Sequence, residues 1–145
     1  MHQAEITLDG VPSSVAVARR AVADLLETAG AFDQVWAALQ AVSELATNAV
    51  VHARTAFAVG IYVDDVYVRI TVTDERPSAL ATKRSFSAEA TTGRGLRLVE
   101  ALSREWGVDS TGSTKTVWCK IERMPADDAY EVDDYESETA FADRA

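Results

Sequence analysis

The chain has 145 residues, enough for one domain of ordinary size with a buried core. Apolar residues make up 48% and charged residues 26%, as in a soluble globular protein, and no apolar run approaches the roughly 20 residues of a membrane span. The net charge of −9 argues against nucleic acid as the main partner, because phosphate binding requires clustered lysine and arginine. The single cysteine, Cys119, excludes an intramolecular disulfide and a cysteine zinc cluster. With no basic and apolar leader at the N-terminus, these features predict a cytoplasmic protein.

The acidic charge is concentrated toward the C-terminal end. From residue 123 onward there are eight acidic and two basic residues, which gives −6 and leaves −3 for residues 1–122. This last segment has no helical or strand periodicity and contains Pro125 near its start. We therefore predict a folded domain over residues 1–122 and an acidic, disordered tail over residues 123–145. A binding role for Tyr130 and Tyr135 is the alternative for the tail.

The first predicted elements are a strand over residues 4–9 and two helices. A glycine and a proline end the strand, and a serine at position 13 or 14 can cap an amphipathic helix that runs to about Ala29. The second helix is expected to have Asp33 as its N-cap and to continue to about Ala53.

Two runs of alternating β-branched and aromatic residues follow, over residues 55–63 and 66–74. Asp64 and Asp65 separate them, so the two runs predict a β-hairpin. Residues 75–92 then show little periodicity. A loop of this length within a compact domain is unusual unless it has a function.

A helix opened by glycines is expected over residues 93–107, and the sequence VDSTG then leads to a last strand over residues 115–122. The order is strand, two helices, two strands, loop, helix and two strands. Strands clustered in this way predict an α+β fold. We expect a two-layer α/β sandwich, in which helices cover one face of a mainly antiparallel mixed sheet.

The second predicted helix carries polar residues in an otherwise apolar sequence, AVSELATNAVVHA. Glu44, Asn48 and His52 recur every four residues and so lie on one side of an α-helix. A solvated helix face is the simpler explanation for any one of them. An asparagine inside a helix is a mild cost, however, because it competes with the backbone for hydrogen bonds. A glutamate with an asparagine one turn later supplies a proton acceptor beside an oxygen ligand of the kind that Mg²⁺ prefers.

A second candidate site is the sequence TTGRGLRLV, where the third helix begins. Gly93 and Gly95 let the backbone approach a ligand, and the free N–H groups of a helix N-terminus favour an anion such as phosphate. Arg94 can add a charge-assisted contact, although a simple turn also explains the glycines. Asp74, at the end of the strand before the long loop, can accept from a nucleobase amine or can be an ordinary strand-end residue.

Taken together, these segments resemble the Bergerat-fold ATPases, the superfamily of gyrase, histidine kinases and MutL. Within it, the chain looks most like the small anti-sigma-factor serine kinases of the RsbW type. The sequence SELATNAVVHA resembles the family's N box, VTD lies where the first glycine box is found, TGRGLRLV resembles the second glycine box, and GSTKTVW the closing strand. The resemblance covers about residues 1–122.

The resemblance implies a role for each matching residue. Asn48 would coordinate a Mg²⁺ ion that bridges the phosphates of ATP, and Glu44 would be the general base toward the attacking hydroxyl. Asp74 would bind the adenine amino group, with Thr116 supporting it through water. The phosphates would be held at the helix N-terminus by Gly93, Arg94, Gly95 and Leu96. His52 fits the motif without an assigned role.

The same resemblance implies an ATP-dependent protein serine/threonine kinase. Such a kinase would sequester a sigma factor and phosphorylate a STAS-domain anti-sigma-factor antagonist, as a homodimer with no direct nucleic-acid or membrane partner. Residues 75–92 would form the lid of its site.

One departure from the family pattern favours a different function. The first glycine box often reads Asp-x-Gly-x-Gly, whereas Glu75, Arg76 and Pro77 follow Asp74 in this chain. Proline fixes φ and removes an N–H donor, so this side of the pocket should be stiffer. The alternative is therefore a protein-binding module of the same fold, with weak or absent ATP binding, that regulates transcription through partner switching.

Overall fold

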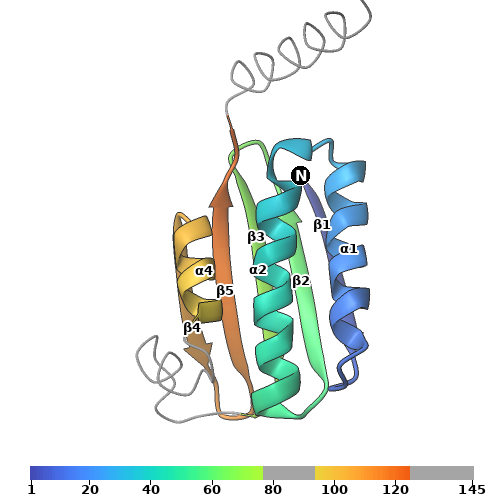
Figure 1. The fold of residues 1–145 in the computed structure, drawn as a ribbon, viewed down its shortest axis with the longest axis vertical. Coiled ribbons are helices and arrows are strands. Elements are labelled where there is room, and N and C mark those ends of the chain that lie inside the picture. The colour runs from blue at the N-terminus through green and yellow to red at the C-terminus, as the bar shows by residue number, and fades with distance from the viewer. Residues whose placement is uncertain (77–93, 125–145) are drawn as a thin grey trace, which may run out of the picture.

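The computed structural model describes residues 1–76 and 94–124, which form a layer of helices on a five-stranded sheet (Figure 1). The strands are β1 (His2–Leu8), β2 (Phe57–Val63), β3 (Tyr67–Asp74), β4 (Glu105–Ser110) and β5 (Lys115–Glu122). The helices are α1 (Ser14–Thr28), α2 (Val35–Asn48) and α4 (Arg94–Leu102), with a 3₁₀ turn η1 (Phe32–Gln34) and a π-helical turn η2 (Ala49–Ala53). The expected acidic tail beyond residue 124, and all but the first two residues of the expected lid, lie outside the described residues.

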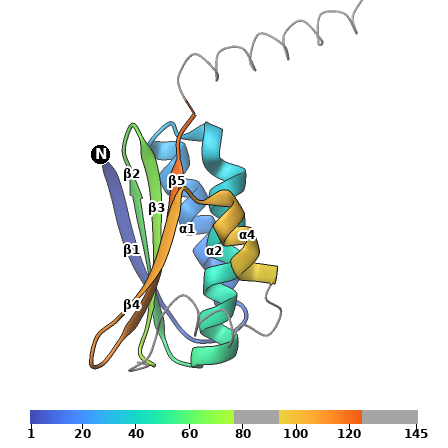
Figure 2. The same ribbon diagram turned by 90° about the vertical axis from the view of Figure 1, so that its left-hand side faces the viewer.

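The sheet has the strand order β1-β2-β3-β5-β4, and each neighbouring pair in it is antiparallel. The β2–β3 and β4–β5 connections are hairpins, and β5 is placed between β3 and β4. Figure 2 shows α1, α2 and α4 together on one face of this sheet. The predicted α+β class, with helices on one face of the sheet, is confirmed.

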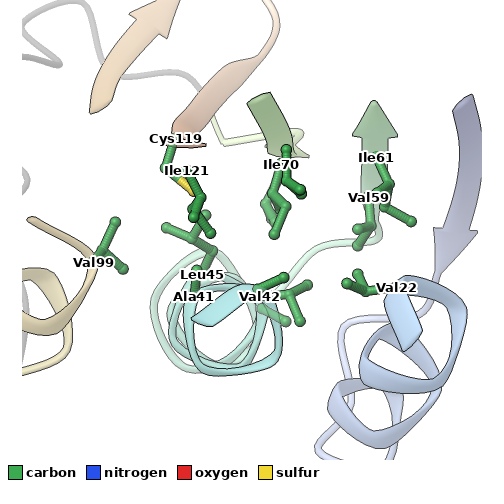
Figure 3. Packing of buried hydrophobic residues seen from close by; sticks show 14 of the residues in the cluster. Val22, Ala41, Val42, Leu45, Val59, Ile61, Ile70, Val99, Cys119 and Ile121 are labelled. Carbon is green, nitrogen blue, oxygen red and sulfur yellow. The ribbon is translucent and has the colours of Figure 1, made fainter. Parts of the chain in front are cut away.

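The core lies between the two layers because each strand presents alternate apolar residues to the helices. Ala41, Val42 and Leu45 of α2 point toward the sheet, where Ile70 and two residues of β5 meet them (Figure 3). The small side chains of α2 allow this close approach, since its alanines at 37, 38, 41 and 46 are all buried. The hydrophobic face therefore fixes which side of α2 remains for other chemistry.

The predicted β2–β3 hairpin is present, and Asp64 stabilises its turn. One carboxylate oxygen of Asp64 accepts hydrogen bonds from the backbone N–H groups of Val66 (2.8 Å) and Tyr67 (2.7 Å). These two donors favour the charged carboxylate, and they lower the pKa of Asp64 below its ordinary value.

Asp33 does not cap α2, contrary to the prediction. Asp33 lies in η1, and its carboxylate accepts hydrogen bonds from the Arg123 guanidinium (3.1 Å) and from the backbone N–H of Met124 (2.9 Å). The neighbouring Gln34 donates to the carbonyl oxygen of Glu122 (2.7 Å). These bonds join the end of β5 to the start of α2, a long-range contact that outweighs the local preference for a cap.

The second predicted helix ends its α-helical part at Asn48 and not at Ala53. A π-helical turn follows, which the backbone N–H of Arg54 closes by donating to the carbonyl oxygen of Ala49 (3.1 Å). Arg54 itself has a φ of 57°, in the left-handed region, which turns the chain toward β2. Because a π turn is wider than an α turn, His52 does not continue the row of Glu44 and Asn48 as an α-helix would place it.

The third predicted helix is also shorter than expected. It ends at Leu102, and residues 105–110 form strand β4 instead of the last helical turn. Trp106 is buried toward the helices, while Gly107 lies opposite Trp118 of β5. A Cβ atom at Gly107 would lie 2.6 Å from the Trp118 ring, so glycine lets this ring lie across β4.

Candidate functional site

The predicted site residues gather at one end of the sandwich. There α2 and β3 end and β5 begins, at the lower end of the molecule in Figure 1, whereas α4 begins part of the way up the sandwich. The last residue of α2 is Asn48 and the last residue of β3 is Asp74. The first residues of α4 and β5 are Arg94 and Lys115. Three segments that are distant in the sequence thus bring Asn48, Asp74 and Lys115 to the same end of the fold.

Asn48 carries an unusual amide. The side chain is partly buried, and its Nδ2 atom has no hydrogen-bond partner among the described residues. A buried N–H group without an acceptor costs about 1–3 kcal/mol, so such groups are rare unless a bound ligand or water serves them. Glu44, one helical turn earlier, is also partly buried and lies on the same side of α2. The pair can present a carboxylate and an amide to one ligand.

Asp74 and Lys115 form a buried ion pair. Lys115 Nζ lies 3.4 Å from Asp74 Oδ2, and the two residues are only 6% and 3% exposed. They face each other because their Cα atoms are register partners in the β3–β5 ladder. The other carboxylate oxygen of Asp74 accepts from the backbone N–H of Arg76 at 2.9 Å. The carboxylate is therefore held in one orientation by two donors.

The segment after β3 is tied to the end of the second helix. Arg76 donates from its guanidinium to the carbonyl oxygen of His52 (2.6 Å), and the backbone N–H of Glu75 donates to the Thr55 hydroxyl (3.1 Å). Glu75 and Arg76, which replace the glycine turn of the resembling family, thus connect the end of β3 to η2 and Thr55 by hydrogen bonds. We call this hydrogen-bonded segment the wall after β3. His52 contributes its backbone carbonyl to this wall.

The second glycine sequence is only partly within the described residues. Gly93 lies outside them, and Arg94 and Gly95 are the first two residues of α4. Leu96 is 3% exposed and belongs to the hydrophobic core, so its side chain anchors α4 against the sandwich. What Leu96 can offer to an anion is its backbone N–H, in the first turn of the helix.

The structure does not bring Thr116 to Asp74. The Thr116 hydroxyl lies 2.7 Å from the Thr73 hydroxyl, its register partner on β3. Successive side chains of a strand point to opposite faces. Val117 and Cys119 lie in the core beneath the helices, so Thr116 lies on the other face of the sheet and Lys115 takes the place beside Asp74.

Lys115 lies in the segment that resembles the family's closing Lys-Thr strand, but the resemblance assigns a role to Thr116 and none to Lys115. Its signal is the alternation in KTVWCKIE, since residues 115, 117, 119 and 121 share one face of the strand and three of them are apolar. A lysine at the start of this buried face requires an acidic partner, and Asp74 supplies it.

Within residues 1–76 and 94–124, two kinds of feature are absent. No helix there is long and apolar enough to cross a membrane. No three His, Cys, Asp or Glu side chains in these ranges gather in a group that could hold a metal ion.

The comparisons with known proteins agree with this geometry. The crystal structure of the RsbU and RsbW domains of Rv1364c from Mycobacterium tuberculosis is similar in fold, with a TM-score of 0.66 and 22% sequence identity. The similarity covers 87% of the present chain but 34% of that one, so this chain spans about a third of its length. No curated protein matches the chain. The family model of the histidine kinase-like ATPase domain matches residues 10–121, and the chain therefore belongs to this ATPase family.

Proposed function

We propose that the chain is an ATP-binding protein serine/threonine kinase that regulates transcription in the cytoplasm. It sequesters a sigma factor, phosphorylates a STAS-domain anti-sigma-factor antagonist and acts as a homodimer. Membership of the ATPase family supports ATP binding, and the motif resemblance to RsbW-type kinases supports the substrate class. The observation that carries the proposal is the unpartnered, buried amide of Asn48, at the end of the fold where β3 ends with Asp74.

The residues present fit a magnesium–nucleotide complex. The Asn48 side chain offers an amide oxygen as a hard ligand for Mg²⁺, and its N–H group can donate to a phosphate oxygen. The first backbone N–H groups of α4 lack partners within the helix and favour the phosphates. When bound, ATP supplies the phosphoryl group and Mg²⁺ offsets the negative charge of the phosphates.

Glu44 is the proposed general base. It lies one turn before Asn48, so it faces the same ligand while the core-facing side of α2 remains apolar. A carboxylate there orients the attacking serine or threonine hydroxyl and accepts its proton. Asp74, whose buried carboxylate lies beside Lys115, holds the adenine amino group.

A second function is favoured by the wall after β3. The bonds from Arg76 to Asp74 and to His52 fix a segment that is a glycine turn in the resembling family. If this wall prevents nucleotide from entering, the chain acts as a binding module that regulates transcription through its partners alone.

The proposed kinase activity is tested by phosphotransfer to purified STAS-domain proteins from the source organism. Wild-type protein with Mg²⁺ and ATP should place phosphate on a serine or threonine of one of them, as detected by mass spectrometry. Glu44→Gln should keep ATP binding and lower the transfer rate roughly 10²–10⁴-fold, because the attacking hydroxyl loses its base.

Glu27→Gln is the matched control, since this glutamate is exposed on α1 at the other end of the molecule. It should transfer phosphate at the wild-type rate. Undiminished transfer by Glu44→Gln would remove Glu44 from its role. A wild-type protein that binds a sigma factor and a STAS-domain protein but does not bind ATP would support the binding module instead.

A further inference from the structure

The buried pair of Asp74 and Lys115 is a costly arrangement for stability alone. Apart from these two, the buried residues in the described part of the chain are uncharged. Removing two charges from water carries a desolvation penalty that their attraction often fails to offset, and apolar replacements of such pairs are frequently neutral or stabilising. A pair of this kind at a ligand site suggests a function for both members.

Both side chains are directed to the helix-covered face of the sheet, at the end where the nucleotide is proposed to bind. Asp74 follows Ile70 and Val72 on that face of β3, and Lys115 precedes Val117 on that face of β5. The ladder places the Cα atom of Lys115 opposite that of Asp74, the ion pair holds the ammonium beside the carboxylate, and Arg76 holds the carboxylate. The site therefore presents one acceptor and one donor at a separation of 3.4 Å.

This arrangement matches the edge of an adenine base. Adenine carries an N6–H donor next to the N1 acceptor, whereas guanine carries the O6 acceptor next to an N1–H donor, the reverse order. A carboxylate beside N6 and an ammonium beside N1 would satisfy adenine at two points. An ammonium has three N–H donors, so Lys115 can serve Asp74 and a base nitrogen together.

We propose that Lys115 is a specificity-determining residue, which donates a hydrogen bond to N1 of adenine while Asp74 accepts one from N6. The proposal rests on the proposed ATP binding and adds a contact to it. A site built to make a hydrogen bond rejects an analogue that lacks the partner atom, because its own buried group is then left unsatisfied. Lys115 thereby makes the pocket selective for adenine.

The test compares ATP with 1-deaza-ATP, in which a C–H group replaces N1, by calorimetry in the presence of Mg²⁺. Wild-type protein should bind ATP roughly tenfold or more tightly than 1-deaza-ATP, as expected for a hydrogen bond from a charged donor. Lys115→Met should weaken ATP binding and bind the two nucleotides with equal affinity, because methionine fills the space without a donor.

Two further variants control for an unpaired buried charge and for the general effect of replacing a lysine. Asp74→Asn combined with Lys115→Met removes both charges, so it avoids an unpaired buried carboxylate, and it too should fail to discriminate between the nucleotides. Lys120→Met is the matched control, because Lys120 lies on the other face of β5, near the Tyr67 ring. This control should keep the wild-type preference for ATP.

The outcomes separate the contact from the proposed function. If the wild type binds ATP but does not distinguish 1-deaza-ATP, or if both Lys115 variants keep the preference, the role of Lys115 is wrong while ATP binding stands. Tighter ATP binding by Lys115→Met would likewise overturn it, since the lysine would then obstruct the base. A wild type that binds neither nucleotide would refute the proposed function itself.

Discussion

At the residue scale, Asn48 lowers the stability of the nucleotide-free protein, while its proposed role is to bind the ligand. Its buried Nδ2 atom has no partner in the described part of the chain, and asparagine is a poorer helix former than alanine. Asn48→Ala should therefore raise the free energy of unfolding of the nucleotide-free protein by about 0.5–1 kcal/mol, as measured by urea denaturation.

Ser43→Ala is the comparison variant on the same helix, because the Ser43 side chain has hydrogen-bond partners, whereas Asn48 Nδ2 has none among the described residues. The Ser43 hydroxyl donates to the carbonyl oxygen of Leu39 (2.6 Å) and accepts a hydrogen bond from Arg19 of α1. Its removal should lower the free energy of unfolding by about 1 kcal/mol. If Asn48→Ala is destabilised to a similar extent, the Asn48 amide is bound within the protein and is not held ready for a ligand.

The local sequence indicates where three of the candidate site residues lie in the fold. Glu44 and Asn48 are separated by one helical turn, and Asp74 ends a clearly alternating strand, so the sequence around each indicates its position. Lys115 is different, because its role depends on which strand lies beside β3. That neighbour is set by the whole sheet, and the motif comparison favours Thr116, which the alternation places on the other face.

At the scale of elements, a glycine in β4 leaves the space that the Trp118 side chain of β5 fills. An added Cβ at Gly107 would meet the Trp118 ring at 2.6 Å, and the Arg69 guanidinium lies over the same ring at 5.4 Å. Gly107→Ala should therefore lower the free energy of unfolding by about 1–3 kcal/mol, because the ring must move and its contacts are lost. Thermal denaturation measures this effect.

Gly112→Ala is the control in the β4–β5 turn, where an added Cβ would have no atom within 4 Å. This variant should change the stability by less than about 0.5 kcal/mol. Equal effects of the two substitutions would show that the Trp118 ring does not require glycine in β4.

Element boundaries are less predictable than element types for related reasons. The hairpin and the core-facing helices follow from periodicity, which is a local property. Arg123 holds the carboxylate of Asp33, and the residues after Leu102 pair with β5 as strand β4, so both depend on contacts with distant segments. Such contacts override local propensity, and a single sequence does not display them.

At the scale of the whole molecule, the rate at which a thiol reagent labels Cys119 measures how often the folded domain opens. This thiol is 0% exposed in the core of the sheet, and burial raises its pKa to about 11. A buried and protonated thiol is a poor nucleophile, so at pH 8 it should react with a thiol reagent roughly 10³-fold or more slowly than in the urea-unfolded chain.

Bound nucleotide should slow this reaction further, because a ligand that binds only the folded state stabilises it. At about 100 times the dissociation constant, ATP with Mg²⁺ should reduce the rate roughly 100-fold if the thiol is reached by global unfolding. Cys119→Ala gives the background of the assay. Rapid labelling of native Cys119 would contradict the closed core between the sheet and α2.

The central claim is that Asn48 binds the Mg²⁺ ion of a Mg²⁺–ATP complex at this end of the sandwich. Isothermal titration calorimetry of ATP with and without Mg²⁺ tests this claim most directly. Wild-type protein and the exposed neighbour variant Thr47→Ala should both bind ATP more tightly with Mg²⁺. Asn48→Ala should remain folded and lose the Mg²⁺-dependent part of the affinity. Equal Mg²⁺-dependent binding by Asn48→Ala, or no ATP binding by wild-type protein at millimolar nucleotide, would contradict the account.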